Sequence, residues 1–309
     1  ISADFSANSS TDFGSFGSRI AYDIRHTNAY LYSHIRLPST MTWTLGVSYD
    51  SSRNQWYGDY DQVNPKLGLI WELTPDTILR LAAFRTFDRG IEEDATIEPT
   101  QIAGFNQFYD GFVATDARRY GVGLDHKFSS NLMVGLEASL RDVITPIVLD
   151  VSLDAQSETS KQEEMLYRAY GYWAINDSFA ASLEYQFDIY TRDAVTIYQN
   201  HIAPLSLSYF HPSGLSSTVT VTYVNQEAYE GKAPFLKGHD DNQFALLDFS
   251  LKYRLPYRYG TAGFVVKNLL DQKFDFLGQN AFGIRTGRLE ETPLFIPERT
   301  MFFQLTLAF

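Results

Sequence analysis

The sequence predicts an all-β protein, a closed antiparallel transmembrane β-barrel of about 14 strands. Three observations lead to this prediction. Apolar residues recur at every second position in many segments. Short turn-like segments alternate with long ones along the chain. No stretch approaches the roughly 18 consecutive apolar residues that a membrane helix needs, so a helical membrane protein is excluded.

The period-two pattern is clearest between Thr42 and Asp50. Its apolar positions alternate with threonine, glycine, serine and aspartate, which gives the segment one apolar and one polar face. The same alternation recurs in 120–128, 132–140, 179–189, 247–255 and 300–309. These segments are therefore predicted to be strands.

The polar face distinguishes a barrel from a water-soluble sandwich, which would also alternate. It carries many Gly, Ser and Thr with sparse charges of both signs, which suits a crowded, wet interior. Aromatic residues lie near the ends of the apolar rows, as in Trp43 and Tyr49. Interfacial girdles explain this placement; ordinary core aromatics are the alternative.

The connections between predicted strands give independent support. Turn-forming residues mark short connections at 38–40, 74–76, 129–131, 176–178, 212–214 and 256–259. Long segments lie between them, at 51–62, 88–116, 142–164, 191–200, 225–244 and 271–296. Outer-membrane barrels have short periplasmic turns and long extracellular loops. We therefore expect an even number of strands, with the first pairing with the last to close the barrel.

Composition limits the partners. The 309 residues suit one barrel domain, and a net charge of −12 without clustered Lys and Arg makes nucleic acid an unsuitable partner. The absence of Cys fits an exported chain. No signal peptide begins at Ile1, so we expect a processed chain or the C-terminal part of a longer precursor. Outer-membrane lipid and lipopolysaccharide are the expected surroundings.

Several segments resemble the C-terminal half of TonB-dependent receptor barrels. Phe309 ends an alternating strand, which resembles the signal read by the barrel assembly machinery. Asn268, Leu269 and Asp271 match a motif at the end of the penultimate strand. The matching segments are 27–50, 63–84, 266–274 and 297–309. "YFHPSGL" and "YRLPYRYG" are similar to plug-less barrels attached to tetratricopeptide repeats, which implies a periplasmic repeat domain or partner.

This resemblance implies an outer-membrane location and a role in transport. The chain is too short for the roughly 22 strands of the receptor family and lacks its plug domain and energy-coupling box. We therefore expect an outer-membrane pore or export channel. The alternatives are a truncated TonB-dependent receptor that takes up a siderophore or similar ligand, and a structural or adhesion barrel with a blocked lumen.

Charged residues on the polar faces are candidates for the lumen lining. They either pair across neighbouring strands and rigidify the wall, or they select the solutes that pass. The candidates are Asp50, Lys66, Glu72, Arg119, Asp125, Lys127, Glu137, Arg141, Arg168, Glu184, Asp188, Asp248, Lys252 and Arg254.

The long segment 88–116 holds a second set of candidates, in which acidic residues precede aromatic ones. Carboxylates accept hydroxyl hydrogen bonds and rings stack on apolar sugar faces, so the loop could bind a cationic or sugar-like solute. Alternatively, it folds over the barrel mouth and narrows the pore. The candidates are Glu92, Glu93, Asp94, Phe105, Phe108 and Tyr109.

The sequence contains no pattern typical of an enzyme. None of its six His residues has metal-ligand spacing, no nucleophile and base are paired, and no glycine-rich nucleotide loop is present. We therefore expect neither catalytic activity, nor a cofactor, nor a metal.

Overall fold

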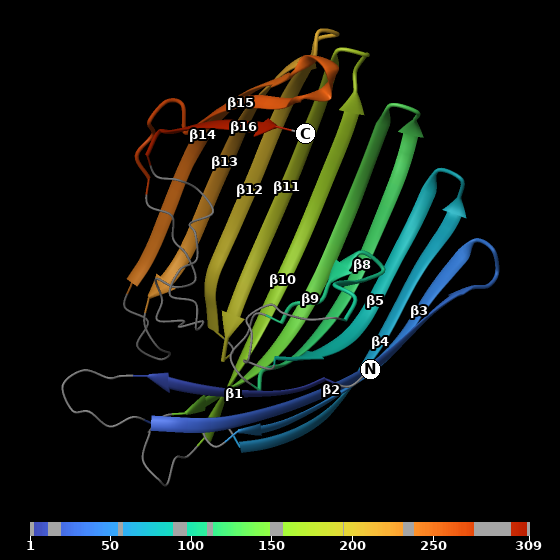
Figure 1. The fold of residues 1–309 in the computed structure, drawn as a ribbon, viewed down its shortest axis with the longest axis vertical. Helices are drawn as coiled ribbons and strands as arrows, with labels where there is room; N and C mark the ends of the chain where they lie inside the picture. The colour runs from blue at the N-terminus through green and yellow to red at the C-terminus, as the bar shows by residue number, and fades with distance from the viewer. Residues whose placement is uncertain are drawn as a thin grey trace. The chain divides into compact units, whose positions relative to one another are not determined.

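The computed structural model describes residues 3–11, 20–54, 58–88, 98–109, 114–148, 157–193, 195–230, 238–274 and 298–307. They form an antiparallel sheet of 14 strands in which strands adjacent in sequence are neighbours (Figure 1). The predicted all-β class, the antiparallel order and the number of strands are thus confirmed. No helix in this part of the chain is long and apolar enough to cross a membrane.

The large sheet follows chain order from its first strand to its last. Its strands are β1 (Ala3–Thr11), β2 (Ile20–Arg36), β3 (Met41–Asn54), β4 (Gly58–Thr74), β5 (Thr77–Phe87), β8 (Asp116–Ser129), β9 (Leu132–Val148), β10 (Ser157–Ala174), β11 (Phe179–Arg192), β12 (Val195–Phe210), β13 (Leu215–Glu230), β14 (Gly238–Arg254), β15 (Gly260–Lys267) and β16 (Thr300–Leu307). A separate hairpin consists of β6 (Gln101–Ile102) and β7 (Phe105–Asn106), and a 3-10 helix, η1, spans Pro256–Arg258.

All six predicted short turns lie between strands. The predicted long connection at 191–200 is wrong, because β11 continues to Arg192 and β12 begins at Val195. Strands such as β2, with 17 residues, exceed the roughly 9–11 residues that cross a bilayer. Residues expected in loops therefore continue the strands on the long-loop side.

The two ends of the sheet are β1 and β16. Within the described ranges, no ladder joins these two strands. Their pairing, which would close the barrel, stays a prediction.

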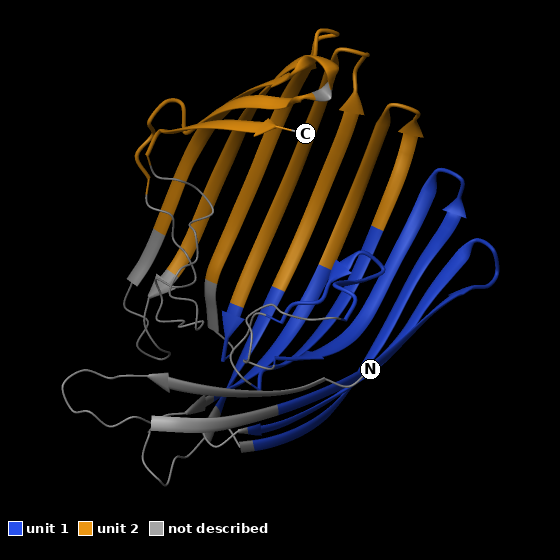
Figure 2. Ribbon diagram, viewed as in Figure 1, with its two compact units in different colours: residues 1–123, 139–164, 191–194 blue, residues 124–138, 165–190, 195–309 orange. Residues whose placement is uncertain are grey.

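The chain divides into two compact units (Figure 2). Unit 1 consists of residues 1–123, 139–164 and 191–194, and unit 2 of residues 124–138, 165–190 and 195–309. Individual strands, such as β10, contribute to both units. The prediction of a single domain is not tested by this division.

Burial in unit 1 is the reverse of that in a water-soluble protein. On β3, Ser48 and Asp50 are buried, whereas Leu45, Val47 and Tyr49 are exposed. Unit 2 repeats the pattern with exposed Leu205 and Leu207 on β12. Soluble proteins rarely expose such continuous apolar surface, whereas a strand between lipid and a polar interior requires it. The two predicted faces are confirmed, and we call them the polar face and the apolar face.

The apolar face of the β3–β4 hairpin ends at Tyr49, beyond which charged residues begin. Arg53 donates to both Asp61 oxygens, at 3.2 and 3.0 Å, and the Tyr49 hydroxyl donates to Asp61 at 2.9 Å. The Arg53 hydrogen bonds are the main reason why the pKa of Asp61 falls to about 2; Ser51 and Tyr49 add to the effect. Exposed charges cannot face hydrocarbon, so Tyr49 marks the membrane boundary on the long-loop side.

Candidate functional site: a hairpin seated on the polar face

Asp50 lies at the centre of a buried hydrogen-bond network on the polar face of β2, β3 and β4. Its Oδ1 accepts hydrogen bonds from His26 Nε2 at 3.1 Å and Asn28 Nδ2 at 2.9 Å, and its Oδ2 accepts one from Asn64 Nδ2 at 2.6 Å. Only 1% of Asp50 is exposed. Several donors satisfy this buried carboxylate. Asp50 therefore links β2, β3 and β4, and we call the part of the sheet that carries the polar face the wall.

A buried ion pair connects this wall to the segment 98–109. Lys66 Nζ lies 3.8 Å from Glu98 Oε2, and both side chains are 0% exposed. The Lys66 ammonium also donates to Gln107 Oε1 at 2.6 Å, and Glu98 accepts a 2.7 Å hydrogen bond from the Tyr32 hydroxyl. Glu98 and Gln107 flank the β6–β7 hairpin, so the wall holds both of its ends.

The tip of the hairpin is a two-residue turn between Ile102 and Phe105. Ala103 and Gly104 have φ values of 48° and 88°, and positive φ at both central residues is characteristic of a type I′ turn. Ile102 and Phe105 are buried in an apolar cluster with Ala82 and Phe84 of β5. The tip therefore packs on the strand wall, whereas the ends of the segment are held by polar contacts.

Glycines on the polar face make room for the hairpin. A Cβ atom at Gly68 would lie 2.7 Å from Ile102 Cγ2, and one at Gly121 would overlap the Phe105 ring. Real Cβ atoms do not approach this closely, so larger residues at these positions would displace the tip. The absence of side chains at Gly68 and Gly121 thus provides the space in which the hairpin lies.

Phe108 follows the hairpin and remains 37% exposed. The guanidinium carbons of Arg119 on β8 and Arg141 on β9 lie 4.9 and 5.4 Å from its ring centre. Arg119 also donates to Asn106 O at 3.2 Å, and Arg141 donates to both Glu164 oxygens at 3.1–3.2 Å. The segment is thereby fixed to a second pair of strands.

The structure brings together Asp50, Lys66, Arg119 and Arg141 among the predicted lumen residues of unit 1. All four brace the wall or hold the segment 98–109. Glu72 lies elsewhere, at the short-turn end of β4, where it forms an exposed 3.5 Å ion pair with Arg36.

In unit 2, predicted lumen residues pair with near neighbours. Arg168 lies 3.3 Å from Glu184. Asp125 accepts a hydrogen bond from the Tyr170 hydroxyl. The other members of the set are Asp248, which pairs with Lys267 at 2.7 Å; Asp188, which accepts a hydrogen bond from Gln186 at 2.8 Å; partly buried Glu137; and exposed Lys252 and Arg254.

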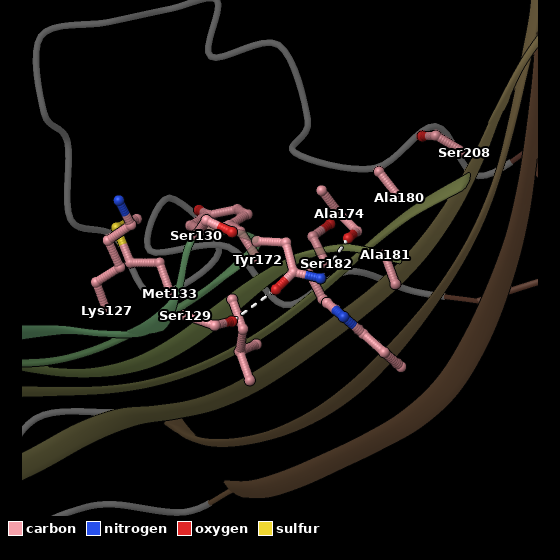
Figure 3. A pocket seen from close by; sticks show the side chains of 13 residues that line it. Lys127, Ser129, Ser130, Met133, Tyr172, Ala174, Ala180, Ala181, Ser182 and Ser208 are labelled. Atoms are coloured by element: carbon pink, nitrogen blue, oxygen red, sulfur yellow. Dashed lines mark hydrogen bonds between the residues drawn. The ribbon is translucent and has the colours of Figure 1, made fainter. Parts of the chain in front are cut away.

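A groove of about 580 Å³ lies at the short-turn end of unit 2 (Figure 3). Lys127, Met133, Tyr172 and Ser182 are among the residues that line it. Asn131 donates to the Ala174 carbonyl at 3.0 Å and fixes the neighbouring turn. The groove has no cluster of titratable groups suited to catalysis.

Two sets of predicted residues lie outside the described ranges. They are the acidic residues Glu92, Glu93 and Asp94, and the terminal Phe309. Phe105 and Tyr109 of the predicted loop set are buried, so Phe108 is its accessible aromatic residue. The candidate list missed the wall residues His26, Asn28 and Asn64, because uncharged or singly placed polar residues on a strand give no signal without the strand register.

The comparisons with known proteins support the fold. No protein-family model matches the chain, and no curated protein matches its sequence. Solved structures do match. A ferric enterobactin receptor, PfeA of Pseudomonas aeruginosa, has 16% identity and a TM-score of 0.66 over 95% of this chain and 46% of its own. The iron transporter FrpB of Neisseria meningitidis has 13% identity and a TM-score of 0.65 over 93% and 45%.

The outer-membrane transporter YddB of Escherichia coli is similar to the same degree, with 14% identity and a TM-score of 0.62 over 94% and 46%. The chain spans less than half of the length of these structures. At such low identity the likeness shows the fold alone, a barrel like those of these outer-membrane receptors and transporters. Together with the exposed apolar face, this fold confirms the predicted location in a bacterial outer membrane. Attachment to tetratricopeptide repeats stays a prediction.

Proposed function

We propose that the chain forms a pore through the outer membrane, with the segment 98–109 as the constriction that selects solutes. The observation that carries this proposal is the seating of the hairpin on the polar face, where the buried Lys66–Glu98 pair and the Ile102–Phe105 tip hold it. A segment fixed on the lumen side of the wall narrows the path at a defined place. The narrowest place of a pore sets which solutes pass.

The architecture fits passive passage. The unit 2 wall carries uncharged polar pairs, such as Ser206 with Thr220 at 2.9 Å and Ser208 with Thr218 at 2.8 Å. Such pairs make the wall wettable, and charged residues of the same unit, such as Arg168 with Glu184 and Asp248 with Lys267, form ion pairs. We further propose that β1 pairs with β16, that Phe309 directs assembly, and that a periplasmic repeat domain delivers or receives the solute.

Single-channel conductance in a planar bilayer tests this proposal. The refolded chain should give steady openings, and Gly121→Val should give larger ones because the new side chain displaces Phe105 and the hairpin. Gly263→Val is the matched control: a Cβ there has no neighbour closer than 3.8 Å, and its conductance should equal that of the parent. A correctly folded but silent parent chain would contradict the pore and support a blocked, structural barrel.

Uptake of a metal–siderophore complex is the second candidate, favoured by the likeness to the ferric enterobactin receptor. In this role the lumen would be gated and the long loops would bind the ligand. Saturable binding of a ferric siderophore to the folded chain, without conductance, would favour the receptor over the pore.

A further inference from the structure

We propose that Phe108 and Glu164 form a binding subsite for a neutral polyhydroxylated ring, a sugar unit, at the constriction. This inference rests on the proposed pore, since it names the solute class that the constriction contacts. Phe108 and Glu164 are the accessible groups of the cluster, with 37% of the Phe108 residue and 32% of the Glu164 side chain exposed.

Part of Phe108 is available to a solute, because 37% of the residue is exposed. Arg119 and Arg141 belong to neighbouring strands, β8 and β9, and both approach the ring from the wall against which the segment lies. Because both guanidiniums come from the wall, we infer that the exposed part of the ring points away from it. A flat aromatic face in water is a stacking surface for another flat, partly apolar ring.

Glu164 supplies an acceptor at the edge of that surface. Its carboxylate accepts hydrogen bonds from Arg141, whose guanidinium carbon is 5.4 Å from the Phe108 ring centre. The ring and the carboxylate thus both contact the Arg141 guanidinium. Because a carboxylate has about four lone-pair positions, it can accept further hydrogen bonds from hydroxyl groups.

Local charge selects among the solutes that could stack on Phe108. Arg119, Arg141 and Glu164 together leave one net positive charge beside the ring, which disfavours a cation. An anion gains little, because Arg119 is buried and only 12% of the Arg141 side chain is exposed. A neutral solute with an apolar face and hydroxyl donors at its rim fits both accessible groups.

Calorimetric titration of the folded chain in detergent with maltohexaose tests this inference independently of conductance. The parent should bind. Phe108→Leu, which keeps an apolar side chain but removes the flat ring, should weaken binding about tenfold, and Phe108→Tyr should restore it. Glu164→Gln should weaken binding by a similar factor through loss of a charged acceptor. Phe128→Leu, an exposed aromatic on the apolar face, is the control and should bind like the parent.

Each result decides the inference. Circular dichroism and heat-modifiable gel migration establish that every variant is folded. Equal binding by the parent and Phe108→Leu, or binding of spermine in place of maltohexaose, would overturn the subsite. Maltohexaose binding by a chain that does not conduct would keep the subsite and reject the pore, so the two failures are distinguishable.

Discussion

Lys66 and Glu98 show how single residues fix the constriction. Removal of water from both charges is costly, and only their mutual attraction and the added hydrogen bonds offset it. The pair fixes the position of the segment 98–109, because each charge would be buried without a counter-ion if the segment moved away from the wall.

Lys66→Met should therefore lower the free energy of unfolding by about 3–5 kcal/mol, since Glu98 stays buried without its cation. Urea unfolding of the chain in detergent micelles measures the change. Lys66→Met combined with Glu98→Leu should recover much of the loss because no buried charge remains. Equal stability of the single variant and the parent would show that the ion pair does not hold the segment.

Asp61 should titrate at about pH 2 in the folded chain, because Arg53 hydrogen-bonds its ionised form. Its folded pKa is lowered, so its stabilising contribution is present above its ordinary pKa of 3.8 and is lost as the pH falls through about 2. Carbon-13 NMR of the carboxyl group measures this titration. Arg53→Gln should raise the pKa towards 3.8, and a parent value near 3.8 would disprove the contact.

At the scale of elements, the β6–β7 hairpin was only partly predictable from sequence. The long segment 88–116 and its possible inward fold follow from its length and aromatic content. The place where the hairpin packs could not be predicted. Gly68 and Gly121 look like ordinary strand glycines in the sequence, and only the strand register shows that they lie under Ile102 and Phe105. The period-two pattern predicted the strand faces well, since it depends on local alternation alone.

The position of the hairpin can be tested through the glycine beneath it. A Cβ at Gly68 would lie 2.7 Å from Ile102 Cγ2, so Gly68→Ala should lower the free energy of unfolding by about 1–3 kcal/mol through overpacking. Gly263→Ala is the control, because a Cβ there has no neighbour closer than 3.8 Å. Urea unfolding in detergent micelles measures both variants. Equal stability of Gly68→Ala and the parent would place the hairpin away from the wall.

At the scale of the whole chain, sequence and structure agree on an antiparallel sheet with exposed apolar and buried polar residues. The predicted lengths of the outer connections were less accurate, most clearly at 191–200. At this connection the alternation of apolar and polar residues stops at the membrane boundary, whereas β11 and β12 remain paired beyond it. The alternation of apolar and polar residues indicates which part of a strand lies between lipid and lumen. It does not indicate where the backbone hydrogen bonds of that strand end.

Cysteine accessibility at position 108 tests the central claim, that the segment 98–109 constricts an open pore. In a planar bilayer, Phe108→Cys should lose conductance when a charged, water-soluble methanethiosulfonate is added, because the adduct occupies the narrowest place. Leu207→Cys, on the apolar face, should keep its current unchanged. A current that persists in the Phe108→Cys channel after mass spectrometry shows full modification would contradict the account.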